Sequence, residues 1–110
     1  MNFEELVSDQ LMWSLKTFGP GGRQMGLIEH IGKEIDEVMG CLDTQKDPLE
    51  EWVDVMILAI EGAWRSGHTP AEIALAFRRK FIKNSHQRTW PDWRTKSEDE
   101  PIEHVREGEE

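Results

Sequence analysis

The chain has 110 residues and a formal net charge of −9. This length allows one domain with a modest core, and chains of this size commonly gain stability by self-association. The acidic balance argues against a general nucleic-acid or membrane-surface binder, because both partners are polyanions that bind to cationic faces.

A single cysteine, Cys41, excludes an intrachain disulfide and fits a reducing compartment. No apolar segment is long enough to span a bilayer, and residues 1–5 lack the basic start and apolar middle of a secretory signal. We therefore expect a soluble, cytoplasmic protein.

Three start signals of helices follow one another along the chain, each an N-cap residue with Glu three places later. They are Asn2 with Glu5, Asp47 with Glu50, and Thr69 with Glu72. In the last two, proline takes the first predicted helical position, where its missing N–H is harmless. Apolar residues also step by three and four. We predict no strand and four helices, at residues 3–17, 24–41, 48–65 and 70–86.

The helix predicted at residues 48–65 is apolar around most of its circumference. Its narrow polar line consists of Glu50, Asp54, Glu61 and Arg65. Such a helix needs neighbours on several sides, more than a small four-helix bundle supplies. We therefore expect a homo-oligomer, either a dimer or a tetramer.

Asp54 interrupts the apolar run at residues 52–60. An unpaired ionised carboxylate in apolar surroundings costs on the order of several kcal/mol. The chain must therefore supply a proton, a basic partner such as Arg65, or a metal ion.

Two pairs of carboxylates point to the metal ion. Glu34 and Glu37 are three apart in one predicted helix, as are Glu51 and Asp54 in the next, and this spacing places the Cβ atoms of a pair about 5 to 6 Å apart on one face. The connecting turn makes the two helices antiparallel neighbours, and four converging carboxylates cannot all stay ionised without divalent cations. Oxygen ligands favour Mg²⁺ or Mn²⁺ over Zn²⁺, which indicates a di- or triphosphate substrate.

The alternative is that these pairs are solvated helix faces. In so acidic a chain, about four pairs with this spacing arise by chance.

The same residues resemble the MazG-like all-α NTP pyrophosphohydrolases, whose signature is ExxE on one helix and ExxD on the next. Glu34 to Glu37 and Glu51 to Asp54 match this signature, with Lys33 where the family often has a further glutamate. The dATP/dGTP pyrophosphohydrolase branch, found in bacteria and phages, is similar over further stretches. These stretches are residues 17–23, 30–31, 54–67 and 90–94.

The resemblance implies a four-helix MazG-like bundle that cleaves dATP and dGTP between the α- and β-phosphates, giving the monophosphate and pyrophosphate. It implies that Glu34, Glu37, Glu51 and Asp54 hold Mg²⁺ or Mn²⁺, and that Glu34 or Glu37 orients or deprotonates the attacking water. The implied role is control of nucleotide pools or supply of phage DNA precursors.

The resemblance also implies substrate contacts near the end of the last predicted helix. Lys80, Lys83, Asn84 and Arg88 match a stretch that meets the triphosphate in relatives, although each residue could equally be ordinary basic surface. Arg23 follows a glycine-rich turn that is not a P-loop, and it enters as a ligand contact on the resemblance alone.

Trp90 could stack on a purine, with packing onto the bundle as the favoured alternative.

Residues 1–96 are predicted to form the catalytic domain. Residues 97–110 are predicted to be an acidic tail, mobile or loosely docked, because they are rich in acids and poor in apolar residues. Two other functions stay open: a dUTP or dCTP pyrophosphatase of the same superfamily, and a non-catalytic helical oligomerisation or adaptor module whose acidic faces bind basic partners.

Overall fold

A computed structural model describes residues 1–106 of the chain, and these residues form four α-helices and no strand. The helices are α1 (Phe3–Phe18), α2 (Gln24–Asp43), α3 (Leu49–Arg65) and α4 (Pro70–Ile82). A π-helical turn, Lys83–Gln87, follows α4, and a 3₁₀ turn lies at Trp93–Thr95. The all-α prediction is confirmed.

Two of the three predicted helix starts have the expected reciprocal hydrogen bonds. At α1, the Glu5 N–H donates to Asn2 Oδ1 at 2.9 Å, and Asn2 Nδ2 donates to Glu5 Oε1 at 3.2 Å. At α4, the Thr69 N–H donates to Glu72 Oε1 at 3.0 Å, and the Glu72 N–H donates to Thr69 Oγ1 at 3.1 Å. Local side-chain chemistry therefore fixes where these two helices begin.

The predicted start of α3 differs by one residue. Asp47 Oδ1 accepts from the Leu49 N–H at 3.0 Å, and the helix begins at Leu49, so Pro48 precedes the helix instead of opening it. The aspartate forms a turn with the residue two places on, which is a common use of Asp before a helix.

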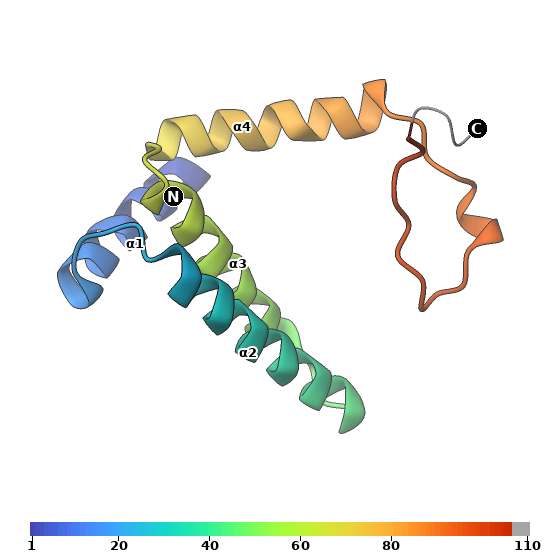
Figure 1. Cartoon of the computed structure of the whole chain (residues 1–110), viewed down its shortest axis with the longest axis horizontal. Coiled ribbons are helices and arrows are strands. Elements are labelled where there is room, and N and C mark those ends of the chain that lie inside the picture. The colour runs from blue at the N-terminus through green and yellow to red at the C-terminus, as the bar shows by residue number, and fades with distance from the viewer. Residues whose placement is uncertain (107–110) are drawn as a thin grey trace. The chain divides into compact units, whose positions relative to one another are not determined.

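The chain divides into two compact units, Met1–Ala74 and Leu75–Glu110. In the first unit α2 and α3 form an antiparallel hairpin, and α1 packs against α3 (Figure 1). The buried apolar side chains all belong to this unit. They are Val7, Leu27, Val38, Leu58 and Trp64.

A buried arginine ties the first unit together. Arg65 Nε donates to Glu61 Oε2 at 2.7 Å, and the two side chains are 0% and 7% exposed. The same guanidinium donates to the carbonyl oxygens of Gly19 at 3.1 Å and Gly21 at 3.0 Å, and to Ser14 Oγ at 3.3 Å. The partner of Arg65 is therefore Glu61 and not Asp54, because Glu61 lies one turn away on α3 and shares its buried face.

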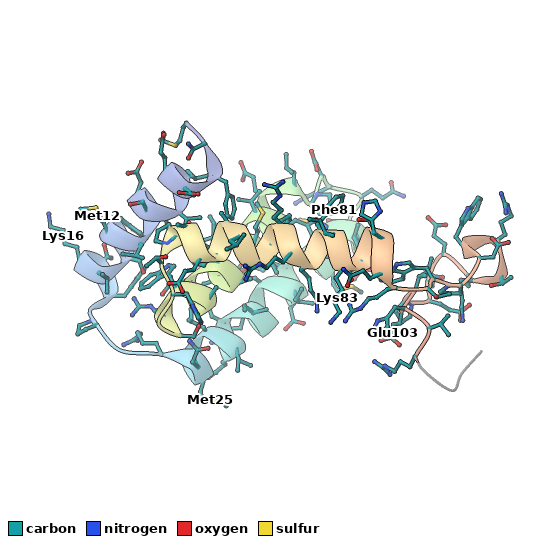
Figure 2. The ribbon with its side chains drawn as sticks, turned by 90° about the horizontal axis from the view of Figure 1, so that it is seen from above. Met12, Lys16, Met25, Phe81, Lys83 and Glu103 are labelled. Atoms are coloured by element: carbon teal, nitrogen blue, oxygen red, sulfur yellow. The ribbon has the colours of Figure 1, made fainter. Side chains whose placement is uncertain are left out.

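Many apolar side chains of the first unit are exposed on the single chain. Met12 and Trp13 of α1 are 67% and 58% exposed, and Trp52 and Met56 of α3 are 51% and 54% exposed. Met12 projects outward from α1 in Figure 2. Asp54 is exposed as well. Asp54 is therefore not enclosed by apolar groups within one chain, since Trp52 and Met56 on the same helix are themselves exposed.

In the second unit the chain after α4 folds back on itself. Trp90 Nε1 donates to the Asn84 carbonyl oxygen at 2.6 Å, and the Val105 N–H donates to the Thr89 carbonyl oxygen at 2.7 Å. The His104 ring contacts the Trp90 ring with centroids 6.0 Å apart. Within the predicted tail, residues 97–106 contain no helix, and Glu107, Glu109 and Glu110 lie outside the described residues.

The predicted domain boundary after residue 96 and the predicted mobility of the tail both stay predictions. None of the helices in residues 1–106 combines the length and hydropathy that a bilayer span requires.

Candidate active site

Three of the four predicted carboxylate ligands converge between α2 and α3. Glu34 and Glu37 of α2 and Asp54 of α3 each offer an oxygen, and these three oxygens lie within 4.8 Å of one another. The convergence follows from the sequence pattern: a spacing of three places the first two on one face of α2, and the antiparallel hairpin brings Asp54 opposite them.

Glu34 is positioned by its neighbour one turn earlier. His30 Nε2 donates to Glu34 Oε1 at 3.1 Å. The other carboxylate oxygen, Oε2, is buried and has no hydrogen-bond donor. Buried acceptors are nearly always satisfied, so this oxygen calls for a cation or a proton. Carboxylates that bind metal ions are commonly held in place by a further hydrogen bond of this kind.

Glu37 responds to the crowding of negative charge. The pKa of Glu37 lies above the ordinary value of 4.5, chiefly because a protonated Glu37 shares a hydrogen bond with Glu34 and because the charge of Glu34 opposes ionisation. Burial and the charges of Asp54 and Glu51 raise this pKa further. A proton on Glu37 therefore offsets part of the repulsion among these carboxylates, and a bound divalent cation would offset more of it.

Glu51, the fourth predicted ligand, is not one of the three converging carboxylates. Its charge raises the pKa of Glu37, and it accepts a hydrogen bond from the Cys41 thiol. Burial is the main cause that raises the pKa of this thiol, and Glu51 adds to it. Glu51 thus contributes charge to the centre while its side chain is engaged with Cys41.

The donor set fits a hard divalent cation. The converging atoms are all carboxylate oxygens, which suit Mg²⁺ or Mn²⁺ and leave Zn²⁺ without the nitrogen or sulfur ligands that it favours. The unsatisfied Oε2 of Glu34 is the atom that such an ion would satisfy first.

A pocket of about 440 Å³ adjoins the carboxylates in the first unit. It runs between α1, α2 and α3. Its lining residues are Gln10, Trp13, Phe18, Arg23, Gly26, Leu27, His30, Glu34, Asp54, Ile57, Leu58 and Glu61. A mostly apolar cavity with a few polar groups at defined places is the usual form of a small-molecule site.

Among the predicted substrate contacts, only Arg23 lies at this pocket. Its backbone is left-handed, with φ at 46°, at the residue that precedes α2. A non-glycine residue in this conformation is uncommon and is often found at binding sites.

The other predicted substrate contacts belong to the second unit. Arg88 Nη1 donates to Asn84 Oδ1 at 2.8 Å, and Asn84 also accepts from Trp90 through its carbonyl oxygen. Lys80 and Lys83 are exposed. In Figure 2, the Lys83 and Phe81 side chains project from opposite sides of the chain near the end of α4. Asn84 and Lys83 lie in the π-helical turn, a feature often found at functional positions.

Gln10, Trp13, Phe18 and Glu61 are pocket residues that the sequence reasoning missed. Glu61 carries a detectable signal, because it follows Asp54 by two helical turns on the same polar line. The aromatic residues of α1 carry none, since exposed and buried aromatics look alike in a sequence.

Comparison with known families matches residues 6–108 to the model of the dATP/dGTP pyrophosphohydrolases. Comparison with curated proteins and with solved structures finds no match. The match spans the carboxylates, the pocket and the second unit as far as residue 108. The chain therefore belongs to the dATP/dGTP pyrophosphohydrolase family and is a nucleoside triphosphate hydrolase.

Proposed function

We propose that the protein is a metal-dependent pyrophosphohydrolase that cleaves dATP and dGTP between the α- and β-phosphates, giving the deoxynucleoside monophosphate and pyrophosphate. The observation that carries this proposal is the convergence of Glu34, Glu37 and Asp54 within 4.8 Å at the edge of a pocket of about 440 Å³. A pocket of this volume lies in the range of small-molecule sites, and cations held by the carboxylates would attract a triphosphate.

Glu34, Glu37 and Asp54 would hold Mg²⁺ or Mn²⁺, with Glu51 as the predicted fourth ligand. A divalent cation in such a site neutralises phosphate oxygens, stabilises the pyrophosphate leaving group and lowers the pKa of water.

The glutamates of α2 have the chemistry to handle the proton of the attacking water. His30 bonds to Oε1 of Glu34, whereas Oε2 is buried and is left without a hydrogen-bond partner. Glu37 is a carboxylate of the same centre, and a carboxylate placed there can orient or deprotonate a water molecule. We assign Glu34 and Glu37 as the catalytic residues.

Lys80, Lys83, Asn84 and Arg88 are proposed to bind the phosphates. Support comes from their charge, from the bond between Arg88 and Asn84 that fixes one cation of the group, and from the resemblance to the phosphate-contacting stretch of relatives. Trp90 is 41% exposed, its N–H is bonded to the Asn84 carbonyl oxygen and its ring contacts His104, so its stacking on a base stays a prediction.

We propose that the protein works as a homo-oligomer, a dimer or a tetramer. The uncovered apolar side chains of α1 and α3, among them Met12, Trp52 and Met56, support this proposal because exposed apolar area of this kind is costly in water. Light scattering coupled to gel filtration tests it, and a monomer at micromolar concentration would overturn it. The cytoplasmic location and the role in nucleotide pools or phage DNA precursors stay predictions.

The decisive experiment is a substrate panel with product identification. The protein is incubated with each of the four dNTPs and Mg²⁺ or Mn²⁺, and products are separated by ion exchange. We expect dGMP and dAMP with pyrophosphate, and slower reaction of the pyrimidine nucleotides. Release of single phosphates, or no product from any dNTP, would refute the proposal.

The same panel tests the two alternatives. Preference for dUTP or dCTP would support the pyrimidine pyrophosphatase. Absence of any product, together with a melting temperature that Mn²⁺ does not change, would support the adaptor module, because an ion that binds the native state must stabilise it.

A further inference from the structure

Glu61 lies at the pocket but is far from the converging carboxylates along α3. It is 5% exposed as a residue, it lines the pocket, and its Oε2 is paired with Arg65 at 2.7 Å. A buried carboxylate at the wall of a cavity is costly unless a partner or a ligand satisfies its oxygens. Arg65 engages one oxygen, so Oε1 is the oxygen that the ion pair leaves for a ligand.

We propose that Glu61 reads the base of the substrate by accepting hydrogen bonds from the Watson–Crick edge of guanine, which makes dGTP the preferred substrate over dATP. This inference rests on the proposed function, because it assigns the pocket to the base of the nucleotide whose phosphates meet the carboxylates of α2 and α3.

The spacing along α3 supports this assignment. Glu61 follows Asp54 by seven residues, so the two side chains share one face of the helix and are separated by about 10 Å along its axis. That is the length of a nucleoside monophosphate from its phosphate to the far edge of its base. A nucleotide with its phosphate at Asp54 therefore extends its base toward Glu61.

Arg65 makes this carboxylate suitable for recognition because the ion pair at 2.7 Å holds the Glu61 side chain in place. The guanidinium is itself held by the carbonyl oxygens of Gly19 and Gly21 and by Ser14 Oγ, so it has little freedom to move. An ionised carboxylate only accepts hydrogen bonds. Guanine presents two donors on its Watson–Crick edge, N1–H and the N2 amino group, whereas adenine presents an acceptor at N1.

The aromatic walls supply binding without choosing between purines. Trp13 and Phe18 meet edge to face, with ring centroids 5.4 Å apart, and are 58% and 50% exposed. Aromatic rings stack on either purine, since each has a similar π-face. Selection therefore falls to the polar side chains that line the pocket, and among them Glu61 is held by its buried ion pair with Arg65. Sites that form hydrogen bonds to one specific edge of a base discriminate far better than apolar shape does.

The test compares dGTP, dATP and deoxyinosine triphosphate on the wild type and on Glu61→Gln. Deoxyinosine triphosphate lacks only the N2 amino group of dGTP. A hydrogen bond to a charged group is worth a factor of about 10 to 100, so kcat/KM of the wild type is expected to fall by about that factor from dGTP to deoxyinosine triphosphate. In Glu61→Gln the amide carbonyl still accepts from Arg65, and its NH₂ faces the donors of guanine.

We expect Glu61→Gln to lower kcat/KM for dGTP by about 10- to 100-fold and to change that for dATP by less than about threefold. Glu50→Gln, an exposed change on the same helix, is the matched control and should leave the ratio of dGTP to dATP unchanged. Equal losses on dGTP and dATP would overturn the inference and reduce Glu61 to a counter-ion of Arg65.

If circular dichroism shows that Glu61→Gln does not fold, the comparison of the three nucleotides on the wild type alone tests the inference. Equal kcat/KM for dGTP and deoxyinosine triphosphate, or a preference for dATP over dGTP, would overturn base reading by Glu61. Failure of the proposed function looks different, because no dNTP would then yield pyrophosphate. Pyrophosphate release without discrimination between the purines would refute this inference and leave the proposed function standing.

Discussion

The two compact units of the chain fix their polar side chains by different means. In Met1–Ala74, Arg65 bonds to Ser14, Gly19 and Gly21, which are more than forty residues away in sequence. In Leu75–Glu110, Asn84 bonds to Arg88 and Trp90, four and six residues away. The first arrangement exists only when the helices have packed, whereas the second depends mainly on the local course of the chain. Mutations should therefore act on the whole fold in one unit and locally in the other.

The largest expected difference comes from a matched pair of arginine substitutions. Arg65→Met leaves Glu61 buried and unpaired, which should lower the free energy of unfolding by about 3 to 5 kcal/mol. Arg88→Met removes a bond between a half-buried side chain and a neutral amide, and should cost about 1 kcal/mol. Urea unfolding followed by tryptophan fluorescence measures both values. Equal losses would remove the contrast between the two units.

The next effect concerns the carboxylate centre. Asp54→Asn keeps the shape of the side chain but removes the only converging charge that α3 supplies. Because altering even the residues behind a metal ligand costs about 10- to 100-fold, we expect pyrophosphate release to fall by at least about 100-fold. Asp43→Asn, at the end of α2, is the control. A folded Asp54→Asn protein with full turnover would remove Asp54 from the site.

A smaller effect is the response of the carboxylate centre to pH and metal. The raised pKa of Glu37 means that the folded, metal-free protein binds a proton more readily than the unfolded chain does. The stability that protonation of Glu37 contributes is complete below pH 4.5, and it is lost as the pH rises through the raised pKa of the folded state.

Metal removes the repulsion that causes this loss. The rise in melting temperature caused by Mg²⁺ should therefore grow from mildly acidic to mildly alkaline pH, and scanning calorimetry with EDTA as the reference measures it. The Lys80→Ala variant, changed in the second unit, is the control, and its metal-induced rise in melting temperature should grow with pH in the same way. A metal-induced rise that is independent of pH would contradict the role of Glu37.

The sequence predicts features that depend on neighbours along one helix and misses those that need packing. The start of α4 at Thr69 and the convergence of Glu34 with Glu37 are matters of spacing, and both follow from the pattern. Glu61 and Arg65 are four residues apart, a spacing that the sequence shows. Their burial, however, depends on the packing of α1 and of the loop at Gly19, which the sequence does not show.

The pocket was missed for the same reason. Phe18 and Gln10 reach it because α1 packs against α3, and no periodicity in α1 states which of its faces borders a cavity.

The smallest expected effect tests a local interaction within the first unit, at the start of α4. The pKa of Glu72 is lowered because its carboxylate accepts hydrogen bonds from the Thr69 backbone and side chain, and His68 adds to the effect. The stability that the ionised Glu72 contributes is present above pH 4.5, and it is lost as the pH falls through the lowered pKa of the folded state. Glu72→Gln should therefore lower the melting temperature at neutral pH, by less than the cap substitution Thr69→Ala, which costs about 1 kcal/mol.

The difference between Glu72→Gln and the wild type should shrink on acidification, because both side chains are then neutral. Thr69→Ala should keep most of its cost in acid, since the Thr69 hydroxyl accepts from the Glu72 N–H at 3.1 Å whatever the charge of Glu72. Melting curves across the acidic range separate the two outcomes. A Glu72→Gln deficit that persists in acid would mean that this helix start depends on packing, as the environment of Arg65 does, and not on local charge.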